Sequence, residues 1–296
     1  MHSQKASPAF TRVELCVVLA VMSLLATLVL PALAREQNRD WRIVCLRRMS
    51  QFATALALYA TDNRDYLPPN YDDGNTAPGF NWCPGQAGVG GVEEFNADIL
   101  KDPKRSMLAQ YLGNDASIFK CPTDTRHGKY PGIGADVDPA RKGQDVPAAR
   151  TVSLNNAVGT NPFLPGCKTP VTGPWLDGNH TYSNNKTWYC YGQTSDFVRP
   201  GPAATFTIAE EDPRSLNDGV FCCMGPNDQS LYKMIDWPMT SHGMAGAFAF
   251  ADGHAEMHRW VDPRTPLFNL YPTTSQQPQS HDLDWIARHA SARINP

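Results

Sequence analysis

The chain has no Cys-x-x-Cys pair, no glycine-rich phosphate loop and no twelve-residue EF-hand spacing. These are the usual sequence signatures of a structural zinc site, a nucleotide site and a calcium-binding loop. No nucleophile triad is recognisable either, and we therefore expect the protein not to be an enzyme. The net charge of the whole chain is −3. Residues 1–62 carry a net charge of +3 and residues 63–296 a net charge of −6. This acidic balance excludes a nucleic-acid surface, which requires clustered basic charge.

Long apolar runs are also scarce, and the one that is present extends from Leu15 to Ala34. Its length is about what a helix needs to cross a hydrocarbon core of ~30 Å. Glu14 stands at its threshold, where a charge is costly and therefore suggests a function. We expect residues 10–34 to be a membrane anchor. The alternative is a cleaved secretory signal, for which residues 31–34 offer an A-x-A-like cleavage site.

The chain becomes charged after this run but keeps a helical period. Its apolar residues recur at spacings of three and four, which places them in one stripe: Trp41, Cys45, Met49, Phe52, Leu56 and Tyr59. The spacing predicts a helix that continues to Asp62 and packs on a globular domain. Pro31 lies inside this helix and is expected to kink it.

The remaining residues contain most of the 25 prolines and 22 glycines, which favours a folded, loop-rich domain. Six of the eight cysteines are there, and an even number in an exported domain favours disulfides: Cys83, Cys121, Cys167, Cys190, Cys222 and Cys223. Six cysteines allow 15 pairings. Pairing Cys83 with Cys121 and Cys167 with Cys190 is therefore only a guess.

A β-hairpin is predicted near the C-terminus. Residues 245–251 alternate small side chains with phenylalanine, Asp252-Gly253 is a two-residue turn signal, and a return strand runs from His254 to about Val261. Such a turn would pair Phe250 with Ala255 and Phe248 with Met257, all on the core face. His254, Glu256 and His258 would then share the other face.

Two metal sites are conceivable. His242, Asp252, His254 and Glu256 have side chains that suit a divalent ion, although turn chemistry already explains Asp252. Calcium would bind near Asp212 and Asp218, within oxygen-rich loops whose composition ordinary turns also explain. The candidate ligands are therefore Asp212, Asp218, His242 and Asp252. No other cofactor is expected.

The middle segment concentrates aromatic side chains beside asparagines: Trp175, Tyr182, Trp188, Tyr189 and Tyr191, with Asn179, Asn184 and Asn185. Such a set can form a carbohydrate-binding face. In a domain rich in proline and glycine it more often supplies the packing that replaces regular structure.

Residues 9–15, Ala-Phe-Thr-Arg-Val-Glu-Leu, resemble the cleavage and methylation signature of type IV pilins and type II secretion pseudopilins. The resemblance implies cleavage between Ala9 and Phe10 by a prepilin peptidase, followed by methylation of Phe10. It also implies that Glu14 pairs with the terminal amine of a neighbouring subunit, and it matches Pro31 to a helix-breaking proline. Ala9 replaces the usual glycine, and Arg12 replaces the usual apolar residue.

A second set of patches resembles prepilin-type proteins with a C-terminal H-x9-D-G element. The set comprises residues 60–68, 111–113 and 119–124, and then His242 followed after nine residues by Asp252-Gly253. Together with the N-terminal motif, the matching patches extend over most of the chain.

These features predict an α+β fold in which a long N-terminal helix, transmembrane in its first half and amphipathic in its second, packs on an antiparallel β-sheet with large loops. The predicted divisions are a leader over 1–9, the helix over 10–62, a β-rich domain over 63–265, and a linker with a short helix over 266–296. That helix is a candidate over residues 281–292.

The predicted function is that of a structural subunit in a type II secretion or type IV pilus-like filament. The expected partners are prepilin peptidase, copies of the chain or other pilin-like subunits, and inner-membrane lipid. The expected location is the bacterial inner membrane, crossed once, with the globular domain in the periplasm or outside the cell. The alternative is a glycan- or ligand-binding protein that uses the helix only as an anchor.

Overall fold

The computed structural model of the chain describes residues 12–181, 187–267 and 275–295. It divides into two compact units, Met1–Trp41 and Arg42–Pro296. Helix α1, Arg12–Asp62, contributes residues to both units. The second half of α1 belongs to the larger unit because its side chains are part of that unit's core. The boundary between units therefore falls about 20 residues before the predicted helix end.

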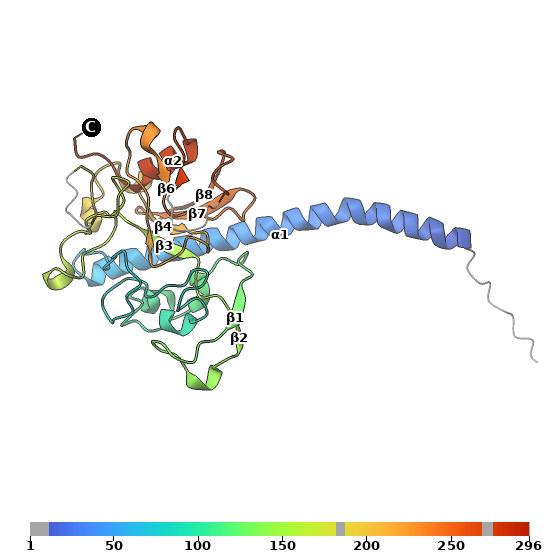
Figure 1. Ribbon diagram of the computed structural model, residues 1–296, viewed down its shortest axis with the longest axis horizontal. Coiled ribbons are helices and arrows are strands. Elements are labelled where there is room, and N and C mark those ends of the chain that lie inside the picture. The colour runs from blue at the N-terminus through green and yellow to red at the C-terminus, as the bar shows by residue number, and fades with distance from the viewer. Residues whose placement is uncertain (1–11, 182–186, 268–274, 296) are drawn as a thin grey trace, which may run out of the picture. The chain divides into compact units, whose positions relative to one another are not determined.

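The larger unit is organised on a five-stranded sheet in the order β5-β3-β4-β7-β8 (Figure 1). Its strands are β3 (Val152–Asn155), β4 (Phe206–Glu210), β5 (Val220–Phe221), β7 (Ala245–Phe250) and β8 (Ala255–Arg259). The pair β3–β5 is parallel and the other pairs are antiparallel. The sheet is therefore mixed, and the prediction of an antiparallel sheet was wrong.

The other described elements are short, apart from helix α2 (His281–Ala290). Two small sheets pair β1 (His127–Lys129) with β2 (Asp145–Pro147), and β6 (Lys233–Met234) with β9 (Ser275–Gln276). Single turns of 3-10 helix lie at Ala97–Leu100, Ala109–Leu112, Ala116–Phe119, Pro139–Arg141, Pro165–Cys167, Thr194–Asp196, Pro202–Ala204 and Gln229–Leu231. Long connections between these elements agree with the high content of proline and glycine.

Both faces of strand β7, which lies between β4 and β8, are buried against different helices. The alanines of β7 pack in one cluster with the stripe of α1, which includes Phe52 and Leu56. Phe248 and Phe250 point into a second cluster with Leu283 of α2. Small side chains let α1 approach the sheet closely, while the phenylalanines fill the space beneath the shorter helix. The alternation seen in the sequence thus separates two cores rather than a core from solvent.

The C-terminal hairpin differs from its prediction by one residue in register. Ala249 pairs with Ala255 and Phe248 with Glu256, because the connection contains three residues, with Gly253 at φ +100°. A shift of one residue moves every side chain of the return strand to the opposite face. His258 therefore packs against Trp285 of α2, with ring centroids 3.7 Å apart, instead of lying on an exposed face.

Within the described residues, no helix combines the length and the apolar character that a membrane crossing requires. This finding overturns the predicted transmembrane half of the helix, the membrane anchor over 10–34 and the single-pass location in an inner membrane.

Candidate functional site

The first candidate surface is the start of α1. From Val13 to Leu25 every large apolar side chain is exposed, with 72% exposure at Val13 and 63% at Leu24. At about 100° per residue, these side chains cover roughly two thirds of the helix circumference. The remaining strip carries smaller side chains, Cys16, Ala20, Ser23 and Thr27. A helix that is apolar over so much of its circumference is stable when other apolar groups enclose it.

The hydroxyl groups of Ser23 and Thr27 find hydrogen-bond acceptors within the helix and do not depend on water for them. Ser23 donates to the carbonyl of Ala20 (2.8 Å), and Thr27 donates to that of Leu24 (2.7 Å). Their polar groups are therefore satisfied within the helix and do not oppose burial. Glu14 lies in the first turn, where a carboxylate is favoured by the helix dipole.

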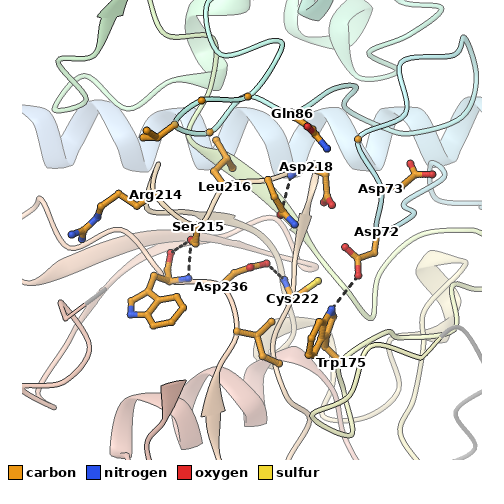
Figure 2. A pocket seen from close by; sticks show the side chains of 18 of the residues that line it. Asp72, Asp73, Gln86, Trp175, Arg214, Ser215, Leu216, Asp218, Cys222 and Asp236 are labelled. Atoms are coloured by element: carbon orange, nitrogen blue, oxygen red, sulfur yellow. Dashed lines mark hydrogen bonds between the residues drawn. The ribbon is translucent and has the colours of Figure 1, made fainter. Parts of the chain in front are cut away.

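The second candidate is a pocket in the larger unit, with a volume of about 790 Å³ (Figure 2). One wall is aromatic, because Trp175 stacks on His180 with ring centroids 5.3 Å apart. Trp175 donates its indole N–H to Asp72 (3.1 Å), and Nε2 of His180 lies 3.0 Å from the same carboxylate. The carboxylate of Asp72 thus holds both rings in place.

Acidic side chains line the pocket beside these rings. Asp218 accepts a hydrogen bond from the N–H of Val220 (2.8 Å), and Asp236 accepts one from the N–H of Cys222 (2.6 Å). Burial, together with the nearby charge of Asp72, raises the pKa of Asp218 well above its usual range. Burial also raises the pKa of Asp236. A protonated carboxyl group can donate a hydrogen bond as well as accept one, so the wall suits a ligand rich in hydroxyl groups.

The predicted metal ligands do not come together. Asp212 binds the guanidinium of Arg214 (2.6 Å), and Asp218 lies in the pocket wall. Asp252 accepts from the backbone and ring of His254 in the hairpin turn. His242 lies elsewhere, buried beside Cys121 and Glu210. Sequence reasoning named His242 and Cys121 separately as candidate site residues but did not name Glu210 or Cys45, which complete this group. Cys45 lies in the predicted apolar stripe of the helix, and this position gave no sign of a polar role.

The predicted disulfides are absent. All eight cysteines are free thiols in the structure, and this overturns the pairings of Cys83 with Cys121 and of Cys167 with Cys190. Cys121 lies beside Cys45 instead, with the two sulfurs 3.4 Å apart. The other candidates, Cys222 and Cys223, are both buried.

The processing residues Ala9 and Phe10 lie outside the described residues, and Pro31 lies within α1. Tyr182, Asn184 and Asn185 of the middle segment also fall outside the description. Of the other aromatic residues in that segment, Trp188 and Tyr191 are buried in the core, and Trp175 lines the pocket. The segment therefore contributes both to the core and to the lining of the pocket.

Comparison of the chain with the families of known proteins, with curated proteins and with solved structures found no match. The resemblance to pilin-like proteins therefore rests on the motifs alone.

Proposed function

We propose that the chain is a structural subunit that assembles with copies of itself through the N-terminal part of α1, in a filament of the type II secretion or type IV pilus kind. The observation that carries the proposal is the exposed apolar surface over residues 13–25. A surface this wide cannot be covered by one neighbouring helix, so several copies must enclose it. Identical helices would offer one another both the bulky face and the strip of small side chains.

Processing would prepare the helix for assembly. In this proposal prepilin peptidase cleaves between Ala9 and Phe10, and the new terminal amine pairs with Glu14 of an adjacent copy. Opposite charges attract strongly when apolar side chains exclude water around them. Such a pair would fix the axial register between neighbouring helices.

The test begins with the mass and N-terminal peptide of the mature protein from its native host. An N-methylated terminus at Phe10 is expected, whereas a terminus at Arg35 would contradict the proposal. Assembly is then measured by sedimentation and electron microscopy for wild type, Glu14→Leu and Leu19→Glu. Both variants should lose filaments. Val198→Glu, which changes an exposed side chain of the larger unit, should keep them.

A second candidate function is the binding of a hydroxyl-rich ligand, such as a glycan, in the pocket of Figure 2. The stacked rings of Trp175 and His180 and the buried carboxyl groups that line the same pocket favour it. Calorimetric titration of the full chain with a panel of oligosaccharides tests this function. Trp175→Ala should abolish binding, while Phe163→Ala, at an exposed ring outside the pocket, should not. Filament assembly should be unchanged in Trp175→Ala, which separates the two functions.

A further inference from the structure

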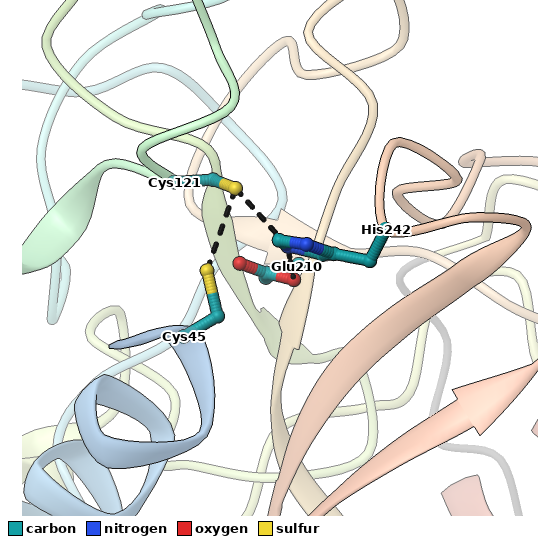
Figure 3. A group of neighbouring side chains, drawn as sticks. All are labelled: Cys45, Cys121, Glu210 and His242. Carbon is teal, nitrogen blue, oxygen red and sulfur yellow. Dashed lines mark hydrogen bonds and ion pairs between the residues drawn. The ribbon is translucent and has the colours of Figure 1, made fainter. Parts of the chain in front are cut away.

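Four side chains that could bind a metal ion meet in the interior of the larger unit (Figure 3). Cys45 comes from α1, Cys121 follows the 3-10 helix Ala116–Phe119, and Glu210 ends β4. His242 lies in the loop before β7 and is the histidine of the H-x9-D-G element. All four are at most 1% exposed. A histidine, a carboxylate and two thiols are unusual neighbours in an otherwise apolar core.

The distances match the edges of a tetrahedron around zinc. Sγ of Cys45 and Sγ of Cys121 are 3.4 Å apart, Sγ of Cys121 is 3.2 Å from Nε2 of His242, and that nitrogen is 3.3 Å from Oε2 of Glu210. Zinc bond lengths of ~2.0–2.3 Å give tetrahedral edges of about 3.3–3.8 Å. The four ligand atoms all lie within 4.8 Å of one another, so enclosing an ion requires side-chain shifts of only about 1 Å.

Neighbouring groups already orient these ligands. The hydroxyl of Thr123 lies 2.9 Å from Sγ of Cys121, and the N–H of Ala247 donates to Oε2 of Glu210 (3.0 Å). Outer contacts of this kind are typical of metal sites because they fix the ligand geometry. Two thiolates and a carboxylate around a divalent zinc would leave a net charge of −1, which these donors help to stabilise.

The geometry also fixes which nitrogen of His242 faces the other ligands. Nε2 lies 3.2 Å from Sγ of Cys121 and 3.3 Å from Oε2 of Glu210. Nδ1 of His242 is buried without a hydrogen-bond partner among the described residues, so the ring acts through Nε2.

We propose that Cys45, Cys121, Glu210 and His242 bind one Zn²⁺ as a structural site. Four protein ligands leave no open coordination position, and the burial of all four leaves no path for a substrate. The ion would join α1 to β4 and to the loops before β7 and after residue 120. Two thiolates, an imidazole and a carboxylate form a ligand set that suits zinc better than calcium or magnesium.

The first experiment measures metal in the reduced full-length protein, purified without chelators. One zinc per chain is expected by mass spectrometry of the elements. Replacement of zinc by Co²⁺ should give visible bands of a tetrahedral site and a sulfur-to-cobalt charge-transfer band. Removal of the metal with a strong chelator should lower the midpoint of thermal unfolding, and added Zn²⁺ should restore it.

Substitution of single ligands tests whether the ion binds at this cluster. Cys45→Ser and His242→Ala should lose the bound zinc and the cobalt spectrum, and Thr123→Ala should weaken binding by about 10–100-fold. Cys83→Ser is the matched control, because Cys83 is equally buried but lies outside the cluster.

Three results would overturn the proposal. The first is an absence of zinc and cobalt binding by the reduced wild-type chain, which needs no variant to fold. The second is zinc that survives in both Cys45→Ser and His242→Ala. The third is a Cys45–Cys121 disulfide in peptides from the native protein, which would require the sulfurs to approach to about 2.05 Å.

Discussion

At the scale of single residues, His258 is a partly buried base that should make stability depend on pH. Its ring stacks on Trp285 and lies 4.8 Å from the ring of Trp260. Burial lowers the pKa of His258 from 6.5 to about 4. The folded state therefore favours the neutral ring. The resulting stability is complete above the unfolded pKa of 6.5 and is lost as the pH falls toward 4, by up to about 3 kcal/mol.

Denaturant unfolding of wild type and His258→Phe at several pH values measures this effect. The phenyl ring can still stack on Trp285 but cannot take up a proton. The variant should lose less stability than wild type between about pH 7 and about pH 4. Parallel pH curves for the two proteins would show that the pKa of His258 is the same in the folded and unfolded states, and would contradict this prediction.

Asp282 holds the first turn of α2 against the loop that follows β8. Its buried carboxylate accepts hydrogen bonds from the N–H groups of Val261 and Asp262 (3.0 Å each) and from the hydroxyl of Thr265 (2.5 Å). Asp282→Ala leaves these donors without an acceptor, and each buried unsatisfied group costs about 1–3 kcal/mol. Asp262 and Thr265 are buried whereas Val261 is exposed, so we expect a loss of about 2–6 kcal/mol in the free energy of unfolding. The neighbouring His281→Ala, at an exposed position, serves as the control and should change it little.

At the scale of elements, single buried side chains of the apolar stripe attach α1 to the core of the larger unit. Phe52 is fully buried, with its ring 5.1 Å from that of Phe119 and 6.2 Å from that of Trp82. Phe52→Ala should cost about 3–5 kcal/mol in thermal or denaturant unfolding. Leu58→Ala, on the exposed side of the same helix, should cost less than about 0.5 kcal/mol. Equal costs at the two positions would mean that the stripe does not anchor the helix.

The elements also show which patterns a sequence can reveal. The stripe was predictable because helical spacing alone decides which side chains share a face, and Cys45, Met49, Phe52 and Leu56 are indeed buried. The hairpin strands were predictable because the alternation of side chains along a strand likewise decides which of them share a face. Their register was not, because it depends on whether two or three residues form the connection. Asp252-Gly253 is compatible with either length.

The sites were less accessible to prediction than the elements. Cys45, Cys121, Glu210 and His242 are separated by at least 32 residues along the chain, so no local spacing links them. Only the packing of α1 and two loops around the end of β4 brings them together. The parallel pair β3–β5 was not predicted either. Strand β5 has only two residues, which is too short for a pattern of alternating side chains.

At the scale of the molecule, the division into two units predicts which fragment of the chain folds on its own. A fragment of residues 42–296 retains every α1 side chain of the larger core and should unfold cooperatively, with a midpoint close to that of the full chain. A fragment that begins at Asp65 lacks the stripe and should not fold. Circular dichroism during heating distinguishes the two fragments. Cooperative unfolding of the shorter one would show that the sheet needs no helix on its alanine face.

The sheet order has a consequence for the synthesis of this protein. The ribosome makes α1 first, but its stripe packs against alanines of β7, which begins at Ala245. Almost two hundred residues must be translated before that partner emerges. The part of the stripe that faces β7 therefore stays without its partner during most of the elongation, although Trp82 and Phe119, which contact Phe52, emerge earlier. A chaperone that shields this helix on the ribosome would give the late strands time to arrive.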